Sequence, residues 1–96
     1  MSFRVVFSAR SDQDLSEIEA FITRESASAD AARNLLSKLY HACLSLEDFP
    51  ERFAFPIYNF QHRMMPVGNY LVFYEIAGED VVVLHIRHAA RKPFSK

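Results

Sequence analysis

The feature that most restricts the fold of this chain is a pair of amphipathic stretches separated by only three residues. In the first stretch, Leu15, Ile18 and Ile22 recur at helical spacing, and Phe21 widens the apolar stripe. The second stretch keeps this spacing with Ala32, Leu35, Leu36, Leu39, Cys43 and Leu46. The break at 26–28 is Ser-Ala-Ser, which offers a serine as the N-cap of the second helix. So short a connection predicts an antiparallel helical hairpin.

A short strand is predicted before this hairpin. Residues 3–8 are mainly apolar and include β-branched side chains, which favours an extended conformation. Ser11 or Asp12 is expected to cap the first helix, because Ser11 and Asp14 have the spacing of a capping box. The other acids of this helix fall mostly outside the apolar stripe and are expected to face water.

The last third of the chain predicts a β-hairpin. Residues 70–76 and 81–88 have strand composition, the turn 77–80 joins them, and residues 63–65 predict a shorter strand that Pro66 ends. Alternation predicts one face against the helices, made of Tyr70, Val72, Tyr74, Ile76, Val82, Leu84, Ile86 and His88. The opposite face would remain uncovered and would carry Leu71, Phe73, Glu75, Val81, Val83, His85 and Arg87. The predicted fold class is α+β with the order β-α-α-β-β-β, in which a helical hairpin packs on one face of a small antiparallel sheet.

Composition restricts the class of function. A length of 96 residues with 50% hydrophobic residues predicts one domain over 1–96 with a real core. A net charge of −1 argues against a protein that neutralises many phosphates, although 81–96 holds bases and no acid. Cys43 is the only cysteine, so no internal disulfide can form, and we read it as a core residue in a cytoplasmic protein. Because the chain lacks a signal peptide and any long apolar run, no membrane partner is expected.

The four histidines do not form a metal-binding motif. His85 and His88 are three apart on one predicted strand and so point to opposite faces, while His41 and His62 lie elsewhere. The chain has no Cys-x-x-Cys and no His-Glu-x-x-His, and its two glycines lie in predicted turns rather than in a phosphate-binding loop. We therefore predict no metal and no cofactor.

A set of polar residues on or just after the sheet remains as the candidate site: Arg63, His85, Arg87, His88 and Arg91. Arginines on a sheet can stabilise a scissile phosphate in a metal-independent ribonuclease, with a histidine or tyrosine as acid or base. The same residues can anchor a protein interface, where arginine is enriched. They can also form a solvated strand face with one core histidine. The residues alone leave all three interpretations open.

The order of several short motifs resembles one known family over nearly the whole chain. The motifs are Phe7-Ser8-x-Arg10 followed by Asp14-Leu15-x-x-Ile18; Leu44-x-x-x-x-Phe49-Pro50; Pro66-Val67-Gly68-Asn69-Tyr70-x-x-Phe73-Tyr74; and Val82-Val83-x-x-x-x-His88-x-x-Arg91. This order resembles the RelE/ParE superfamily of bacterial type II toxins, also called plasmid stabilisation proteins. The resemblance implies two helices on one face of a small antiparallel sheet and a cognate antitoxin as partner.

The resemblance implies two different targets. RelE-like members cleave mRNA on the ribosome with basic residues of the sheet, whereas ParE-like members poison DNA gyrase. Leu71 stands where the nucleases often have arginine, no lysine pair surrounds Arg63, and residues 92–96 contain no tyrosine. These departures favour a ParE-like gyrase inhibitor without hydrolytic activity; an mRNA endonuclease or an inactive interaction module is the alternative.

The candidate residues differ between these two activities. A nuclease would use Arg63, His88 and Arg91, although we assign none of them as catalytic. The residues predicted to bind a partner are Arg63, Leu71, Phe73, His85, Arg87, Arg91 and Lys92.

Overall fold

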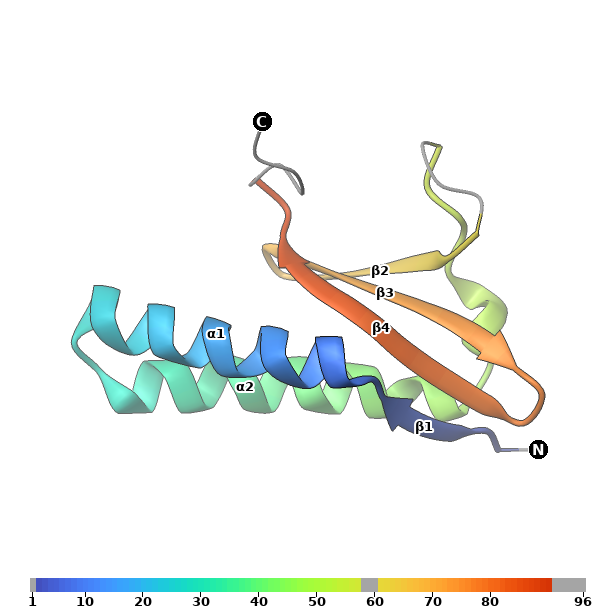
Figure 1. Cartoon of the computed structure of the whole chain (residues 1–96), viewed down its shortest axis with the longest axis horizontal. Helices are drawn as coiled ribbons and strands as arrows, with labels where there is room; N and C mark the ends of the chain where they lie inside the picture. The colour runs from blue at the N-terminus through green and yellow to red at the C-terminus, as the bar shows by residue number, and fades with distance from the viewer. Residues whose placement is uncertain (1, 58–60, 91–96) are drawn as a thin grey trace.

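Two helices lie against one face of a four-stranded sheet in the computed structural model, which describes residues 2–57 and 61–90 (Figure 1). The elements follow in the order β1 (Arg4–Phe7), α1 (Ala9–Ser26), α2 (Ala29–Leu44), β2 (Arg63–Val67), β3 (Tyr70–Ala77) and β4 (Asp80–His88). Two short 3-10 helices, η1 (Ser45–Glu47) and η2 (Pro50–Arg52), lie between α2 and β2. The predicted element order and the helical hairpin are confirmed.

The sheet has the strand order β1-β4-β3-β2. Strands β2, β3 and β4 are antiparallel neighbours, as predicted, but β1 pairs with β4 in the parallel direction. The sheet is therefore mixed. No tight turn joins β1 to β4, so no local sequence signal specified the direction in which these two strands pair.

The first helix begins earlier than its sequence suggested. Ser8, rather than Ser11 or Asp12, is its N-cap: the Ser8 hydroxyl accepts a hydrogen bond from the Ser11 amide at 3.0 Å. The Ser11 hydroxyl donates back to the Ser8 carbonyl at 2.9 Å. For the second helix, Ser28 is the cap, as predicted. Both caps satisfy amides that the first turn of a helix leaves without partners.

A β-bulge in β4 changes which side chains enter the core. Phe73 pairs with His85 and Tyr74 pairs with Val83, so Leu84 is the extra residue of the bulge. The bulge reverses the alternation, and the predicted faces were therefore wrong for four residues. Val81 and Val83 are fully buried in the core, whereas Val82 and Leu84 are only half-buried. Beyond the bulge, Ile86 is buried as predicted.

Cys43 lies in the core between the helices and the sheet. It is fully buried in a cluster with Leu39, Leu46, Val72 and Tyr74. Burial raises the pKa of the Cys43 thiol to about 12 because the thiolate would lose its hydration. The prediction that this cysteine is a core residue is confirmed.

This burial predicts very slow alkylation of the folded protein. At pH 8 we expect iodoacetamide to label Cys43 at least about a hundredfold more slowly in native protein than in urea, because the thiolate is the reacting species. Mass spectrometry of timed aliquots measures both rates. Equal rates with and without urea would show that the thiol is accessible in the native state.

Candidate functional site: the open face of the sheet

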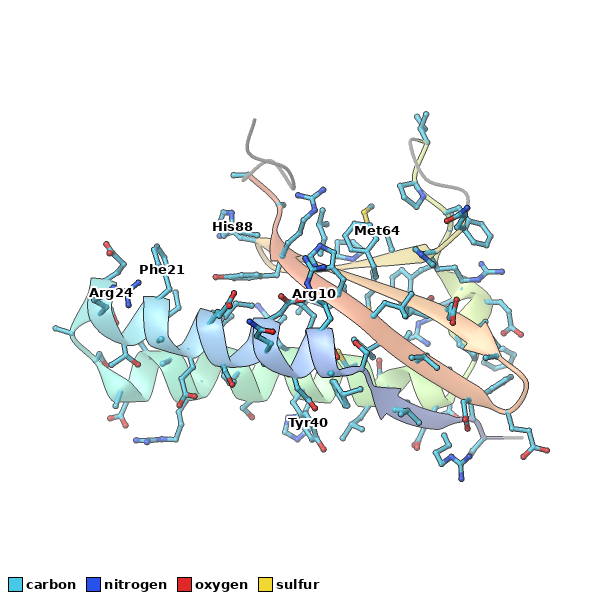
Figure 2. The ribbon with its side chains drawn as sticks, in the orientation of Figure 1. Arg10, Phe21, Arg24, Tyr40, Met64 and His88 are labelled. Atoms are coloured by element: carbon cyan, nitrogen blue, oxygen red, sulfur yellow. The ribbon has the colours of Figure 1, made fainter. Side chains whose placement is uncertain are left out.

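The candidate site is the face of the sheet that points away from the two helices, which we call the open face. The strand register gathers on it three cross-strand rows: His62, Glu75 and Val82; Met64, Phe73 and His85; and Pro66, Leu71 and Arg87. Figure 2 shows Met64 on this side of the sheet, whereas Tyr40 lies on the side of the two helices. The open face is therefore a mixed surface of apolar, histidine and charged side chains.

Phe73 is the centre of the open face. Although it lies on this face, its side chain is buried, with only 5% of its surface exposed. The His85 ring stacks on the Phe73 ring with centroids 5.5 Å apart and planes 18° apart, and the Arg87 guanidinium carbon lies 5.6 Å from the ring centre. Leu71 is the cross-strand neighbour of Arg87. Four of the residues predicted to bind a partner thus lie together.

Asp14 on α1 organises the edge of this cluster. Strand β1 pairs only with residues 80–83 of β4, and side chains from the α1 region continue the hydrogen bonding beyond that point. The Ser8 hydroxyl donates to the Leu84 carbonyl at 3.0 Å, and Asp14 Oδ2 accepts from the Ile86 amide at 2.9 Å. The same Asp14 oxygen lies 3.1 Å from His85 Nδ1. Asp14 therefore fixes both the strand edge and the imidazole.

Arg10 is the second site residue that α1 contributes. Its Nε lies 3.5 Å from Asp14 Oδ1, so one carboxylate separates Arg10 from His85. The Arg10 side chain is 64% exposed, whereas that of Asp14 is only 11% exposed. Figure 2 shows Arg10 beside β4, at the opposite end of α1 from Arg24 and Phe21. The sequence did not single out Arg10 and Asp14 as site residues, because contacts of Asp14 with β4 cannot be predicted from the spacing of residues within a helix.

A second histidine–carboxylate pair lies on the same face. His62 Nδ1 is 3.9 Å from Glu75 Oε1. This nitrogen is buried and has no hydrogen-bond partner within the described part of the chain. The pair brings the residue just before β2 beside Glu75 of β3 on the open face.

Arg63 has a role in the loop before β2. Its Nη1 donates to the carbonyls of Glu51 at 3.1 Å and Phe53 at 2.7 Å, and its guanidinium lies over the Phe55 ring at 4.6 Å. The Tyr74 hydroxyl donates to the Pro50 carbonyl in the same region. Arg63 thus ties the loop to the sheet and is not part of the Phe73 cluster.

His88 lies on the other face of the sheet at the far end of β4. Its ring meets Tyr70 edge-on with centroids 5.1 Å apart, and its Nδ1 accepts a hydrogen bond from the Ala90 amide at 3.1 Å. Arg63 pairs with Tyr74 and His88 with Tyr70, which places Arg63 and His88 at opposite corners, roughly 16 Å apart by strand geometry. The structure does not bring these two nuclease candidates together. Arg91 and Lys92 lie outside the described residues.

Within residues 2–57 and 61–90, no group of three or more His, Cys, Asp or Glu side chains is placed to hold a metal ion. None of the helices in this described part combines the length and apolarity needed to cross a bilayer.

The helical hairpin on a small mixed sheet is the fold of known toxin–antitoxin toxins. A chain from the chromosomal ParDE toxin–antitoxin system of P. aeruginosa superposes with a TM-score of 0.80 at 11% identity, covering 91% of this chain and 96% of that one. A chain of the RelBE2 toxin–antitoxin complex from Mycobacterium tuberculosis has a TM-score of 0.70 at 20% identity, with 95% of each chain covered. At these identities the two likenesses establish the fold.

The family is established by sequence. Residues 5–93 match the family described as the ParE toxin of the type II toxin–antitoxin system parDE. This chain therefore belongs to the ParE toxin family, which confirms the resemblance seen in its motifs. A comparison with curated protein sequences gave no match.

Proposed function

We propose that this toxin acts by binding DNA gyrase and has no hydrolytic activity of its own. The binding surface in this proposal is the open face together with residues 81–96, which contain bases and no acid. The observation that carries the proposal is the cluster of Phe73, His85 and Arg87, because aromatic and arginine side chains supply much of the binding energy at protein interfaces. A gyrase target implies a cytoplasmic location, and we include in the proposal the plasmid-stabilising role that family resemblance suggests.

Cleavage of mRNA on the ribosome has less support. Arg63 is engaged by two carbonyls and an aromatic ring, and His88 lies on the opposite face from His85 and Arg87. A general acid or base must reach the reacting atoms within hydrogen-bond distance, so residues at opposite corners of a sheet cannot serve one phosphate. The nuclease stays the second candidate because the Asp14 carboxylate orients the His85 imidazole, an arrangement that is also found where a histidine acts as a general base.

Two assays on one preparation separate these activities. We expect purified toxin to inhibit supercoiling of relaxed plasmid by gyrase, and to leave mRNA on translating ribosomes intact. A preparation pre-mixed with antitoxin is the matched control for both assays. If the toxin cleaves mRNA on ribosomes and has no effect on supercoiling by gyrase, the nuclease function is correct and gyrase binding is not.

A cognate antitoxin is the second part of the proposal, and the two edges of the sheet differ in their ability to accept it. On β2, the Met64 amide already donates to the Ala54 carbonyl at 3.2 Å, and Pro66 has no amide hydrogen. An added strand would therefore find few donors there. This blocking is a usual protection of edge strands.

Strand β1 offers the better edge. The amides of Arg4 and Ser8 donate to carbonyls at the β4 side of the strand, so the backbone groups of Val5 and Phe7 between them point away from β4. Tyr40 is 47% exposed, and its ring stacks on Phe7 with centroids 5.3 Å apart. We therefore place an extended segment of the antitoxin along β1, where main-chain hydrogen bonds and apolar contacts are both available.

Val6→Lys tests this placement. The Val6 side chain lies at this edge and is already partly exposed, and a lysine on an edge strand opposes strand addition. We expect the affinity for the antitoxin, taken as the product of a short adjacent gene, to fall about tenfold. Isothermal titration calorimetry measures the change, and Thr23→Lys on the exposed end of α1 adds the same charge as a control. Equal affinities for the two variants would exclude the β1 edge.

A further inference from the structure

Phe49, between the two 3-10 helices, is both strained and exposed. Its backbone has φ +49° and ψ +58°, a left-handed conformation that suits glycine or asparagine and strains a bulky residue. Its side chain is 78% exposed, so most of the apolar ring surface does not stabilise the core. A phenylalanine here therefore contributes little to folding, and departures of this kind are expected at functional sites.

Hydrogen bonds hold the backbone of Phe49 on both sides. Arg52 Nη1 donates to the carbonyls of Asp48 at 2.6 Å and Phe49 at 3.2 Å, and the Arg52 amide donates to the Phe49 carbonyl at 3.1 Å. The Tyr74 hydroxyl donates to the Pro50 carbonyl. The ring is thus presented on a fixed backbone, which lowers the entropy cost of binding.

Phe49 lies close to the free edge of β1. The Arg4 amide donates towards β4, so the Phe3 amide points the other way, and it donates to the Glu47 carbonyl at 2.9 Å. Phe3 is two residues from Val5, and Glu47 is two residues from Phe49. At roughly 3.3 Å per residue, an extended segment paired with Val5 reaches Phe49 within about six further residues. One bound chain can therefore contact both.

The charges around Phe49 indicate the chemistry of its partner. Residues 47–52 contain three exposed carboxylates and one base: Glu47, Asp48, Glu51 and Arg52. The base is directed at main-chain carbonyls, and no ion pair among the described residues involves the three carboxylates. This negative excess is opposite in sign to residues 81–96 of the proposed gyrase-binding surface. It complements a segment with lysine or arginine beside an apolar side chain.

We propose that the Phe49 ring is a binding contact for the antitoxin, covered by an apolar side chain that lysine or arginine residues flank. The inference rests on the antitoxin segment lying along β1, as proposed above, and extends that segment to residues 47–52. The apolar side chain covers the exposed ring, while the flanking cations meet Asp48 and Glu51. Aromatic residues supply much of the binding energy at protein interfaces.

The first test is isothermal titration calorimetry of the full-length toxin with the product of the short adjacent gene. Phe49→Asn removes the ring and suits the left-handed backbone, so we expect the dissociation constant to rise at least about tenfold. The thermal midpoint should equal or exceed that of the wild type, because strain is relieved. A merely structural role for Phe49 would instead lower the midpoint.

Two variants are matched controls. Phe49→Tyr keeps an aromatic ring and should stay within about threefold of the wild-type affinity. Ile57→Asn removes a side chain that is 89% exposed, from the loop before β2 that Figure 1 shows leading away from β1. It should leave the affinity unchanged.

The second test concerns charge. Asp48→Asn with Glu51→Gln should raise the dissociation constant about fivefold at low salt, and the affinity of this variant should depend less on salt than that of the wild type. Because the variant keeps Phe49, it tests the inference even if Phe49→Asn does not fold. Tighter binding by this variant would mean that the partner segment is acidic, and would overturn the inference.

Three results with Phe49→Asn would also overturn it. These are an unchanged affinity for the antitoxin, loss of gyrase inhibition alone, or conversion of a self-associating wild type to a monomer, which would assign the ring to a second copy of the chain. Comparison with Val6→Lys separates this inference from the β1 placement. Weaker binding by Phe49→Asn alone supports the contact and removes the β1 edge, whereas weaker binding by Val6→Lys alone removes only the Phe49 contact.

Discussion

Asp14→Ala is expected to lower the free energy of unfolding by about 3 kcal/mol, because it leaves the buried Ile86 amide without its acceptor and His85 without its anchor. For a chain of this size, the thermal midpoint should fall by roughly 12–24 °C. The loss is large because Asp14 joins α1 to β4 at the point where β1 no longer pairs with it. Scanning calorimetry of the two proteins measures the change.

Two matched variants isolate the cause. Asp14→Asn keeps an oxygen that can accept from the Ile86 amide, so it should recover part of the stability. Glu19→Ala removes an exposed carboxylate from the same helix and should change the free energy of unfolding by less than about 0.5 kcal/mol. A midpoint for Asp14→Ala within a few degrees of the wild type would mean that this carboxylate does not hold helix and sheet together.

The combined variant Arg87→Ala with Arg91→Ala is expected to abolish toxicity while the domain stays folded. Arg87 lies over Phe73 on the open face, and arginine makes two-pronged hydrogen bonds that alanine cannot replace. Because Arg87 is only half-buried, its loss should cost about 1 kcal/mol and lower the midpoint by a few degrees. Growth after induction without antitoxin, measured beside calorimetry, separates activity from folding.

The control for this experiment also removes two arginines. Arg24→Ala with Arg33→Ala changes exposed positions on α1 and α2, away from the open face, and should leave toxicity intact. An Arg87 and Arg91 variant that is folded and fully toxic would show that these two arginines are not part of the proposed gyrase-binding surface. If the variant unfolds, the two arginines are needed for folding, and the loss of toxicity says nothing about binding.

The sequence predicted the elements whose signals are local. The two helices follow from apolar periodicity, and the C-terminal hairpin follows from alternation around a turn that contains Gly78, whose φ is +63°. The same alternation failed for Val81 and Val83, since no glycine or proline marks the bulge at Leu84. That bulge depends on how β4 pairs with β3, which is information from another strand.

In the candidate site, too, only the residues with a local sequence signal were predicted. Alternation before the turn placed Leu71 and Phe73 on the open face, and pairing placed His85 and Arg87 beside them. The role of Asp14 could not be predicted, because its partner Ile86 is 72 residues away and the contact is a main-chain amide with no residue signature. Long-range hydrogen bonds of this kind appear only once the helix is docked.

The pairing of β1 with β4 has a consequence for synthesis of the chain. Arg4 and Asp80 are 76 residues apart, so the backbone groups on one side of β1 find their partners only after β4, the last of the described strands, has been made. The helical hairpin contains only local contacts and can form on the ribosome, whereas the completed sheet needs loop closure over most of the chain. Until β4 has left the ribosomal tunnel, the Phe73 ring lacks His85 and Arg87 over it, and the Asp14 carboxylate lacks its donor, the Ile86 amide. A truncated toxin that ends before residue 80 is therefore expected to be harmless, and the cell gains the time of translation in which to supply the antitoxin.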